Sequence, residues 1–220
     1  MDPNSTLPPP EPDSGTAEDI LANSGKPVQI ANYLSEGWKL FIANPGMPIV
    51  YTVILVVLEL TGVGSLILGL LSGPLIAGYY LALRKQVFGE PVQFGDYLQG
   101  FNNPVPLILT GIVSNFLIGV GTMLLVLPGI YLAVSYLFAI LLTADRNLDF
   151  WQAMETSRKF ITRQWLSFFV LFLVLFALNT VGALAFHIGL LLTVPFTTAT
   201  LLAAYHNLIG LRPPATTVRH

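Results

Sequence analysis

The sequence predicts an all-α, polytopic membrane protein with six transmembrane helices, on three observations. The mean hydropathy is +0.70, and only 10% of the 220 residues are charged, whereas soluble domains carry about a quarter. Three long stretches are almost free of charge, and the basic residues lie only outside their central turns. A chain this apolar cannot cover its surface with polar groups in water, so we expect it in a lipid bilayer.

The two ends of the chain are expected to be tails, at residues 1–27 and 211–220, on either side of a membrane domain at 28–210. The first tail is rich in Pro, Ser, Asp and Glu. Such a composition cannot bury enough apolar surface to fold, so we expect an acidic, disordered segment. Its PPPEP run is alternatively a ligand for a groove that binds proline-rich peptides. A formal net charge of −2 argues against a nucleic-acid partner.

Each apolar stretch is too long for a single span. As one helix, residues 47–83 would be about 55 Å long, against a hydrocarbon core of ~30 Å. We therefore expect three hairpins, at about 47–84, 104–144 and 165–207, with turns near 61–65, 119–121 and 179–182. A short aromatic segment precedes each hairpin: YLSEGWKLF, FGDYLQGF and FWQAMETSRKF. These segments are expected to be amphipathic helices in the cytoplasmic membrane interface.

The basic residues predict the orientation of the six spans. All ten Lys and Arg residues fall before the first hairpin, at the loops between hairpins or after the last one, and none falls in a hairpin turn. Positive residues mark the cytoplasmic side of a membrane. We therefore expect an integral protein of the plasma (inner) membrane with both termini in the cytoplasm.

The three hairpins also predict an internal repeat. Each unit has an interfacial helix, a span, a glycine turn and a second span that carries a proline: Pro74, Pro128 or Pro195. All units begin and end on one side, so they are expected to be parallel repeats. The prolines are expected to kink the second spans. The small residues of SGPLIAG and LPGI, among them Gly129, are expected to let backbones approach closely. The alternative is that the kinks form a hinge or open a central cavity.

Three polar residues recur near the predicted turns: Glu59, Asn115 and Asn179. Ionisable groups within spans often serve as proton relays, cation sites or counter-charges for a substrate, which makes Glu59 a candidate. The alternative is that Glu59 reaches the far interface, since it lies close to a turn. The three residues are expected either to line a vestibule or to bond the hairpins together.

The most charged stretch contains Arg158, Lys159 and Arg163, which form a candidate cytoplasmic docking site for anionic lipid or a partner. The alternative is an ordinary positive-inside distribution, with Asp145 capping a helix or pairing with Arg146. His187 and His206 are expected at opposite faces, as boundary residues. No His, Asp or Glu cluster has metal-ligand spacing and no set of catalytic residues is evident, so we expect no metal, no cofactor and no enzymatic activity.

One region carries a resemblance to known families. The segment LPGIYLAVSYLFAILLTADRN, followed by FWQAMETSRKF, resembles uncharacterised families of bacterial six-span membrane proteins. It is also similar to the membrane domain that precedes the catalytic domain in some glycerophosphodiester phosphodiesterases. The matching residues are Pro128, Gly129, Asp145, Ala153 and Ser157. The resemblance implies a fold and a membrane location, and it supplies no reaction.

Two classes of function follow from these expectations. The first is a membrane scaffold, assembly factor or regulatory component, whose partners are the lipid bilayer and another membrane or cytoplasmic protein. The second is a small-solute or ion transporter or channel that uses Glu59 and the proline-kinked spans. A lipid-modifying enzyme, which would be a third class, requires a polar cluster at the interface, and the sequence shows none.

Overall fold

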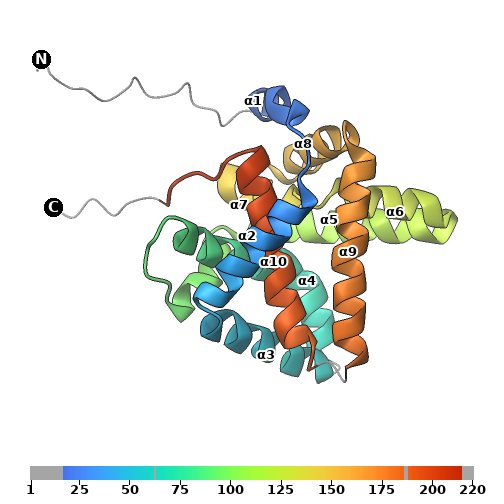
Figure 1. The fold of residues 1–220 in the computed structure, drawn as a ribbon. Coiled ribbons are helices and arrows are strands. Elements are labelled where there is room, and N and C mark those ends of the chain that lie inside the picture. Colours follow the sequence, from blue (N-terminus) through green and yellow to red (C-terminus); the bar gives the residue numbers. More distant parts are fainter. Residues whose placement is uncertain (1–16, 62, 186–187, 215–220) are drawn as a thin grey trace, which may run out of the picture.

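A computed structural model provides the fold and describes residues 17–61, 63–185 and 188–214. Within these ranges every regular element is a helix, which confirms the all-α prediction. The elements are α1 (Ala17–Ala22), η1 (Asn23–Gly25), α2 (Ile30–Ala43), α3 (Gly46–Leu60), α4 (Val63–Val87), η2 (Phe94–Phe101), α5 (Pro104–Leu124), α6 (Val126–Ser135), α7 (Ala139–Arg146), α8 (Phe150–Thr162), α9 (Trp165–Leu184) and α10 (Leu190–Leu208) (Figure 1). The three aromatic segments expected to be short helices are α2, η2 and α8.

Four helical segments of the described chain are long and apolar enough to cross a membrane. They are Ile67–Val87 in α4, then α5, the α6–α7 run Val126–Arg146, and α9. Helices α2 and α3 add a fifth if they count as one span, although they meet at a bend of 93°. The prediction of six spans is not confirmed, because α3 has only 15 residues and α10 is not among the sufficiently apolar helices.

Helix α10 departs from the prediction because it lies inside the protein. It packs against α2, α3, α4 and α9, and residues 198–205 are all buried. Its threonines satisfy their hydroxyl groups within the helix: Thr198 and Thr200 each donate to a carbonyl four residues earlier, at 2.8 Å. The protein therefore covers the polar groups that lower the hydropathy of α10.

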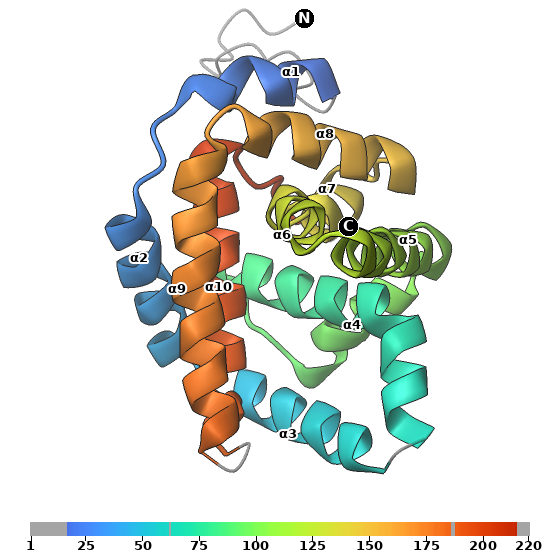
Figure 2. The same ribbon diagram turned by 90° about the vertical axis from the view of Figure 1, so that its right-hand side faces the viewer.

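The expected hairpin partners do pack on one another: α3 on α4, α5 on α6, and α9 on α10. Figures 1 and 2 show, however, that the pairs do not form a parallel bundle. Helices α9 and α10 lie side by side along a common axis, whereas α5 and α6 lie across that axis. The expected arrangement of three parallel hairpin repeats is therefore not confirmed.

Two of the three turns lie later in the chain than predicted. Helix α5 continues to Leu124 and α9 to Leu184, so Gly121 and Gly182 lie inside helices. A Cβ on Gly121 would lie 3.1 Å from the backbone nitrogen of Gly129, and a Cβ on Gly182 would lie 3.0 Å from the carbonyl carbon of Gly189. These glycines allow close contact with the following helix, which is a packing role that a turn pattern does not distinguish.

The three prolines occupy different places in their helices. Pro74 and Pro195 lie inside α4 and α10, and Figure 2 shows α4 sharply bent. Pro128, in contrast, is the third residue of α6. The first N–H groups of a helix have no partner within it, so proline fits there without a kink. The structure thus corrects the expected kink at Pro128: the chain turns before it, at Leu125, whose backbone is extended.

Parts of both predicted tails are ordered against the core, contrary to expectation. Residues 17–25 form α1 and η1, with Ile20 only 2% exposed. Gln164 holds this segment by donating to the carbonyls of Ser24 (3.0 Å) and Lys26 (2.7 Å). Residues 211–214 also belong to the folded part, since Leu211 is buried. The PPPEP run and residues 215–220 lie outside the described residues.

Candidate functional site

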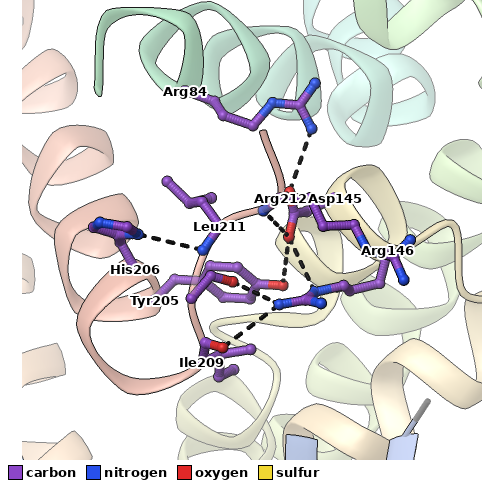
Figure 3. A network of polar contacts seen from close by, with 9 residues as sticks. Arg84, Asp145, Arg146, Tyr205, His206, Ile209, Leu211 and Arg212 are labelled. Atoms are coloured by element: carbon purple, nitrogen blue, oxygen red, sulfur yellow. Dashed lines mark hydrogen bonds and ion pairs between the residues drawn. The ribbon is translucent and has the colours of Figure 1, made fainter. Parts of the chain in front are cut away.

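The most concentrated polar site is a network around the carboxylate of Asp145, at the end of α7 (Figure 3). Its side chain is only 2% exposed. It accepts from Arg84 Nη1 (3.3 Å), the Tyr205 hydroxyl (3.1 Å) and the backbone N–H of Arg212 (3.2 Å), and it pairs with Arg146 Nε (3.2 Å). The network joins α4, α7, α10 and the segment after α10.

Local sequence explains why these groups meet at helix ends. Arg84 and Arg146 lie in the last turns of α4 and α7, where a positive charge is favoured by the helix dipole. Asn147 then adopts a left-handed conformation with φ of 53°, which asparagine tolerates better than most residues. Beyond α10, Gly210 has a φ of 87°, and its carbonyl accepts a 2.7 Å hydrogen bond from Arg146 Nη2. These two turns bring the chain after α10 against α7.

A second ion pair lies next to this network. Lys85 Nζ lies 2.7 Å from Asp96 Oδ1 and so connects α4 to η2. Burial by itself raises the pKa of Asp96. Hydrogen bonds from the Gln93 backbone, Lys85 and Gln99 outweigh that effect and hold the pKa of the carboxyl below its ordinary value of 3.8. Asp96 is therefore a charged anchor for η2.

A polar pocket of about 320 Å³ opens beside the network. It is lined mainly by groups that can form hydrogen bonds, together with Leu81, Leu107, Ala144 and Pro213; the polar residues are Arg84, Gln99, Asn102, Asn103, Thr143, Asp145, Asn147 and Arg212. Arg84 Nε is buried and has no hydrogen-bond partner in the described part of the chain. Arginine and amide donors in this number suit a small anionic or strongly polar ligand.

The structure does not bring the three predicted intramembrane polar residues together. Glu59 is exposed near the end of α3 and lines a different pocket, of about 240 Å³, with Thr52 and Ser72. Asn115 is exposed on α5. Asn179 donates to the Thr197 hydroxyl at 2.6 Å and so joins α9 to α10. No hydrogen bond or shared pocket connects Glu59, Asn115 and Asn179 in the described ranges.

The predicted docking residues likewise do not form one basic cluster. Arg158 and Lys159 both pair with Glu155, at 2.7 and 3.4 Å. The hydrogen bond from Arg158 is the main reason that the pKa of Glu155 is below its ordinary value. Arg163 instead donates to the carbonyl of Leu21 at 2.9 Å, in the N-terminal segment. The predicted pairing of Asp145 with Arg146 is present.

The residues that carried the sequence resemblance have structural roles. Ala153 is fully buried in α8. Ser157 Oγ donates to the Ser135 carbonyl at 2.7 Å and accepts from the Phe138 N–H at 3.2 Å. These two bonds satisfy backbone groups at the break between α6 and α7 and tie that break to α8. Gly129 contacts Thr122 across the α5–α6 turn.

Sequence reasoning missed Arg84 and Tyr205 as members of a site. Arg84 was counted only for its charge, and Tyr205 was passed over although His206 and Asn207 follow it directly. His206 accepts from the backbone N–H of Leu211 at 3.3 Å, while His187 lies outside the described residues. Among the residues that are described, no group of His, Asp or Glu could hold a metal ion.

The fold and site define a helical protein with several apolar helices and a buried ion-pair network at one end. Comparison with family models, curated proteins and solved structures gave no match.

Proposed function

We propose that the protein is an integral protein of the plasma (inner) membrane that acts without catalytic chemistry, as a scaffold, assembly factor or regulatory component. The observation that carries the proposal is the cross-linking of the charged end, beside which the polar pocket opens. There, Asp145 joins three helices and buried side chains fill the space between them, including Leu83, Phe138, Leu141 and Tyr205. A filled and cross-linked framework suits a protein that presents a fixed surface.

Two features support placement in a membrane with the charged end in the cytoplasm. Large apolar side chains are exposed along α3, α5 and α9, for example Val57, Phe116 and Phe176, which in water would be an unusually large apolar surface. The basic residues lie away from the predicted turns, as expected for cytoplasmic segments. The proposal includes the resemblance to uncharacterised families of bacterial six-span membrane proteins.

The packing between helices supports a threefold repeat, although the three hairpins differ in geometry. Each amphipathic helix packs on the second helix of a different hairpin: η2 on α4, α8 on α7, and α2 on α10. Arg84, Asp145 and Tyr205 come from those three second helices and meet at one carboxylate. We infer that a unit of interfacial helix and hairpin was used three times around this point.

The surface available to a partner is the outer layer formed by α1 and α8. Trp151 is 57% exposed there, next to a pocket of about 680 Å³ that also includes Leu21 and Leu148. An exposed tryptophan is a frequent anchor in protein interfaces. It makes this layer the surface to perturb when the scaffold proposal is tested.

The test measures the native size of the protein after extraction of membranes with a mild detergent. The scaffold proposal predicts an assembly larger than the monomer, with a partner in fixed ratio. Replacing Trp151 with Ala is expected to release the partner, while Phe101→Ala, an exposed aromatic of η2, leaves the assembly intact. A monomer in the unmodified protein, or release by both variants alike, would contradict the proposal.

The alternative function is transport of a small solute or ion, and the pocket at Glu59 favours it. That pocket lies between α3, α4 and α10 and contains one carboxylate and two hydroxyl groups. Along α4, however, Ala77, Tyr79 and Tyr80 are buried between this pocket and the one at Arg84. Transport predicts flux in proteoliposomes that Glu59→Gln abolishes and that Glu36→Gln, at an exposed carboxylate of α2, does not change.

A further inference from the structure

We propose that the pocket beside Asp145 binds a phosphate-bearing anion through Arg84, in the form of a phospholipid headgroup or a soluble phosphate ester. The inference goes beyond the scaffold proposal and does not depend on it. It starts from the charge balance of the network. Asp145 carries one negative charge and shares it between Arg84 and Arg146. Asp145 therefore cannot neutralise the guanidinium of Arg84 completely.

The hydrogen bonds of Arg84 lead to the same conclusion. Its side chain is 15% exposed and makes one hydrogen bond to Asp145, by Nη1. Its Nε is buried and has no hydrogen-bond partner among the described residues. A buried donor left unsatisfied is costly, and charged donors cost more. Because Arg84 lines the pocket and its side chain is 15% exposed, an anion there would balance the positive charge of its guanidinium group.

The rest of the pocket supplies further hydrogen-bond donors. Among the described residues that line it, Asp145 is the one carboxylate. Asn102, Asn103 and Asn147 are exposed around the pocket, and their side-chain amides make no hydrogen bond to the described part of the chain. Asn103 is also the residue before α5, so the positive end of that 21-residue helix lies at the pocket. Planar guanidinium and amide donors match the oxygens of a phosphate group.

The place of the pocket makes the lipid source as reasonable as the soluble one. It lies where the apolar helices α4, α5 and α7 meet polar segments, among them the loop before α5 and the chain after α10. Basic pockets between spans at this level are a known way to hold anionic headgroups. A volume of about 320 Å³ accommodates a headgroup or a small phosphate ester.

The test measures thermal stability and calorimetric binding of the full-length protein in uncharged detergent micelles. The soluble probes are inorganic phosphate and glycerol 3-phosphate, at constant ionic strength set with sodium chloride. The lipid probes are short-chain phosphatidylglycerol and, for comparison, short-chain phosphatidylcholine. A ligand that binds only the folded protein raises its unfolding temperature, and the stabilisation grows with the logarithm of one plus the ligand concentration divided by Kd.

Asn103→Asp is the main variant, because it places a negative charge in the pocket without touching Asp145, and aspartate caps a helix as well as asparagine. We expect it to weaken binding roughly tenfold, from repulsion between like charges in a partly exposed site. Gln152→Glu adds the same charge at an exposed position of α8, outside this pocket. This variant should leave binding unchanged. Arg84→Gln should abolish binding.

Each outcome is informative. Stabilisation by phosphatidylglycerol alone identifies a lipid headgroup, and stabilisation by the soluble probes alone identifies a free phosphate ester. Stabilisation by both shows that the phosphate group itself is recognised. The proposal is overturned if no probe acts beyond matched sodium chloride, or if the variant at Asn103 binds as tightly as the unmodified protein.

Discussion

Replacement of Gly78 by alanine tests the contact between α4 and η2. A Cβ at this position would lie 1.9 Å from the carbonyl oxygen of Tyr97 and 2.7 Å from its carbonyl carbon. Ordinary contacts of a Cβ begin at 3.4 Å, so η2 would have to move away by about 1.5 Å. The obstructing atoms belong to the backbone, and a change of rotamer cannot relieve the clash. Gly100 repeats the contact from the other side, against the carbonyl of Pro74.

The magnitude follows from what η2 carries with it. Tyr97 is 1% exposed and packs its ring 4.9 Å from Tyr51 and 5.4 Å from Tyr79. The Lys85–Asp96 pair, at 2.7 Å, is held in the same place. Overpacking of a core usually costs 1–3 kcal/mol, and the loss of these contacts puts Gly78→Ala at about 3 kcal/mol or more. Alanine returns up to ~1 kcal/mol as a better helix former, which leaves a net loss of about 2 kcal/mol.

Gly69→Ala is the matched control, since it makes the same change in the same helix. No heavy atom lies within 4 Å of its Cβ position, so only the gain in helix propensity remains, up to ~1 kcal/mol. The assay is unfolding in one detergent composition, followed by far-ultraviolet circular dichroism. The two variants should differ by about 3 kcal/mol in free energy of unfolding. Equal stability of the two would refute the close backbone contact between α4 and η2.

Three further predictions concern charge and proline. Asp145→Asn leaves buried guanidinium groups without their carboxylate and should cost about 3 kcal/mol or more, whereas Asp149→Asn, at an exposed helix cap, should change the unfolding free energy by less than ~0.5 kcal/mol. Asp96 has a lowered pKa in the folded protein, so its contribution is present at neutral pH and is lost as the pH falls below 3.8. The stability difference between the unmodified protein and Asp96→Asn should therefore be larger at pH 7 than at pH 3; a constant difference would show that the carboxylate charge is not involved. Pro128→Ala should change stability by less than ~1 kcal/mol and leave helix content unaltered, and a large gain in either would restore the kink interpretation.

Local features of the chain were predictable because they depend on local composition. Apolar length predicted the long helices α4, α5 and α9 and the α6–α7 run, and aromatic amphipathic segments predicted α2, η2 and α8. The small residues around Pro74 and Gly129 were expected to allow close backbone approach, and a Cβ on Gly73 would indeed lie 1.8 Å from the Leu107 carbonyl oxygen. Glycine has no side chain, so a position where two backbones can approach closely is visible in the sequence.

The site was not predictable in the same way, because its members are far apart in the chain. Arg84 and Asp145 are 61 residues apart, and Asp145 and Tyr205 are 60. No local periodicity encodes such contacts. The predicted span at α10 is not confirmed for a related reason: the sequence shows how apolar a helix is, and it does not show whether lipid or another helix covers it.

The placement of charges bears directly on the two functional proposals. A transporter needs its ionisable group inside the protein, where removal from water makes its charge useful to a substrate. Glu59 is exposed near the end of α3, and the polar groups around it are two hydroxyls. The buried charges lie elsewhere, at the ends of α4 and α7, where Asp145 links them. Burying a carboxylate between two arginines costs desolvation energy that ion pairing alone rarely offsets, so its presence there favours a role at that end of the molecule. That role would be to bind an anionic ligand at Arg84, or to bind a partner protein through the rigid surface around Arg84.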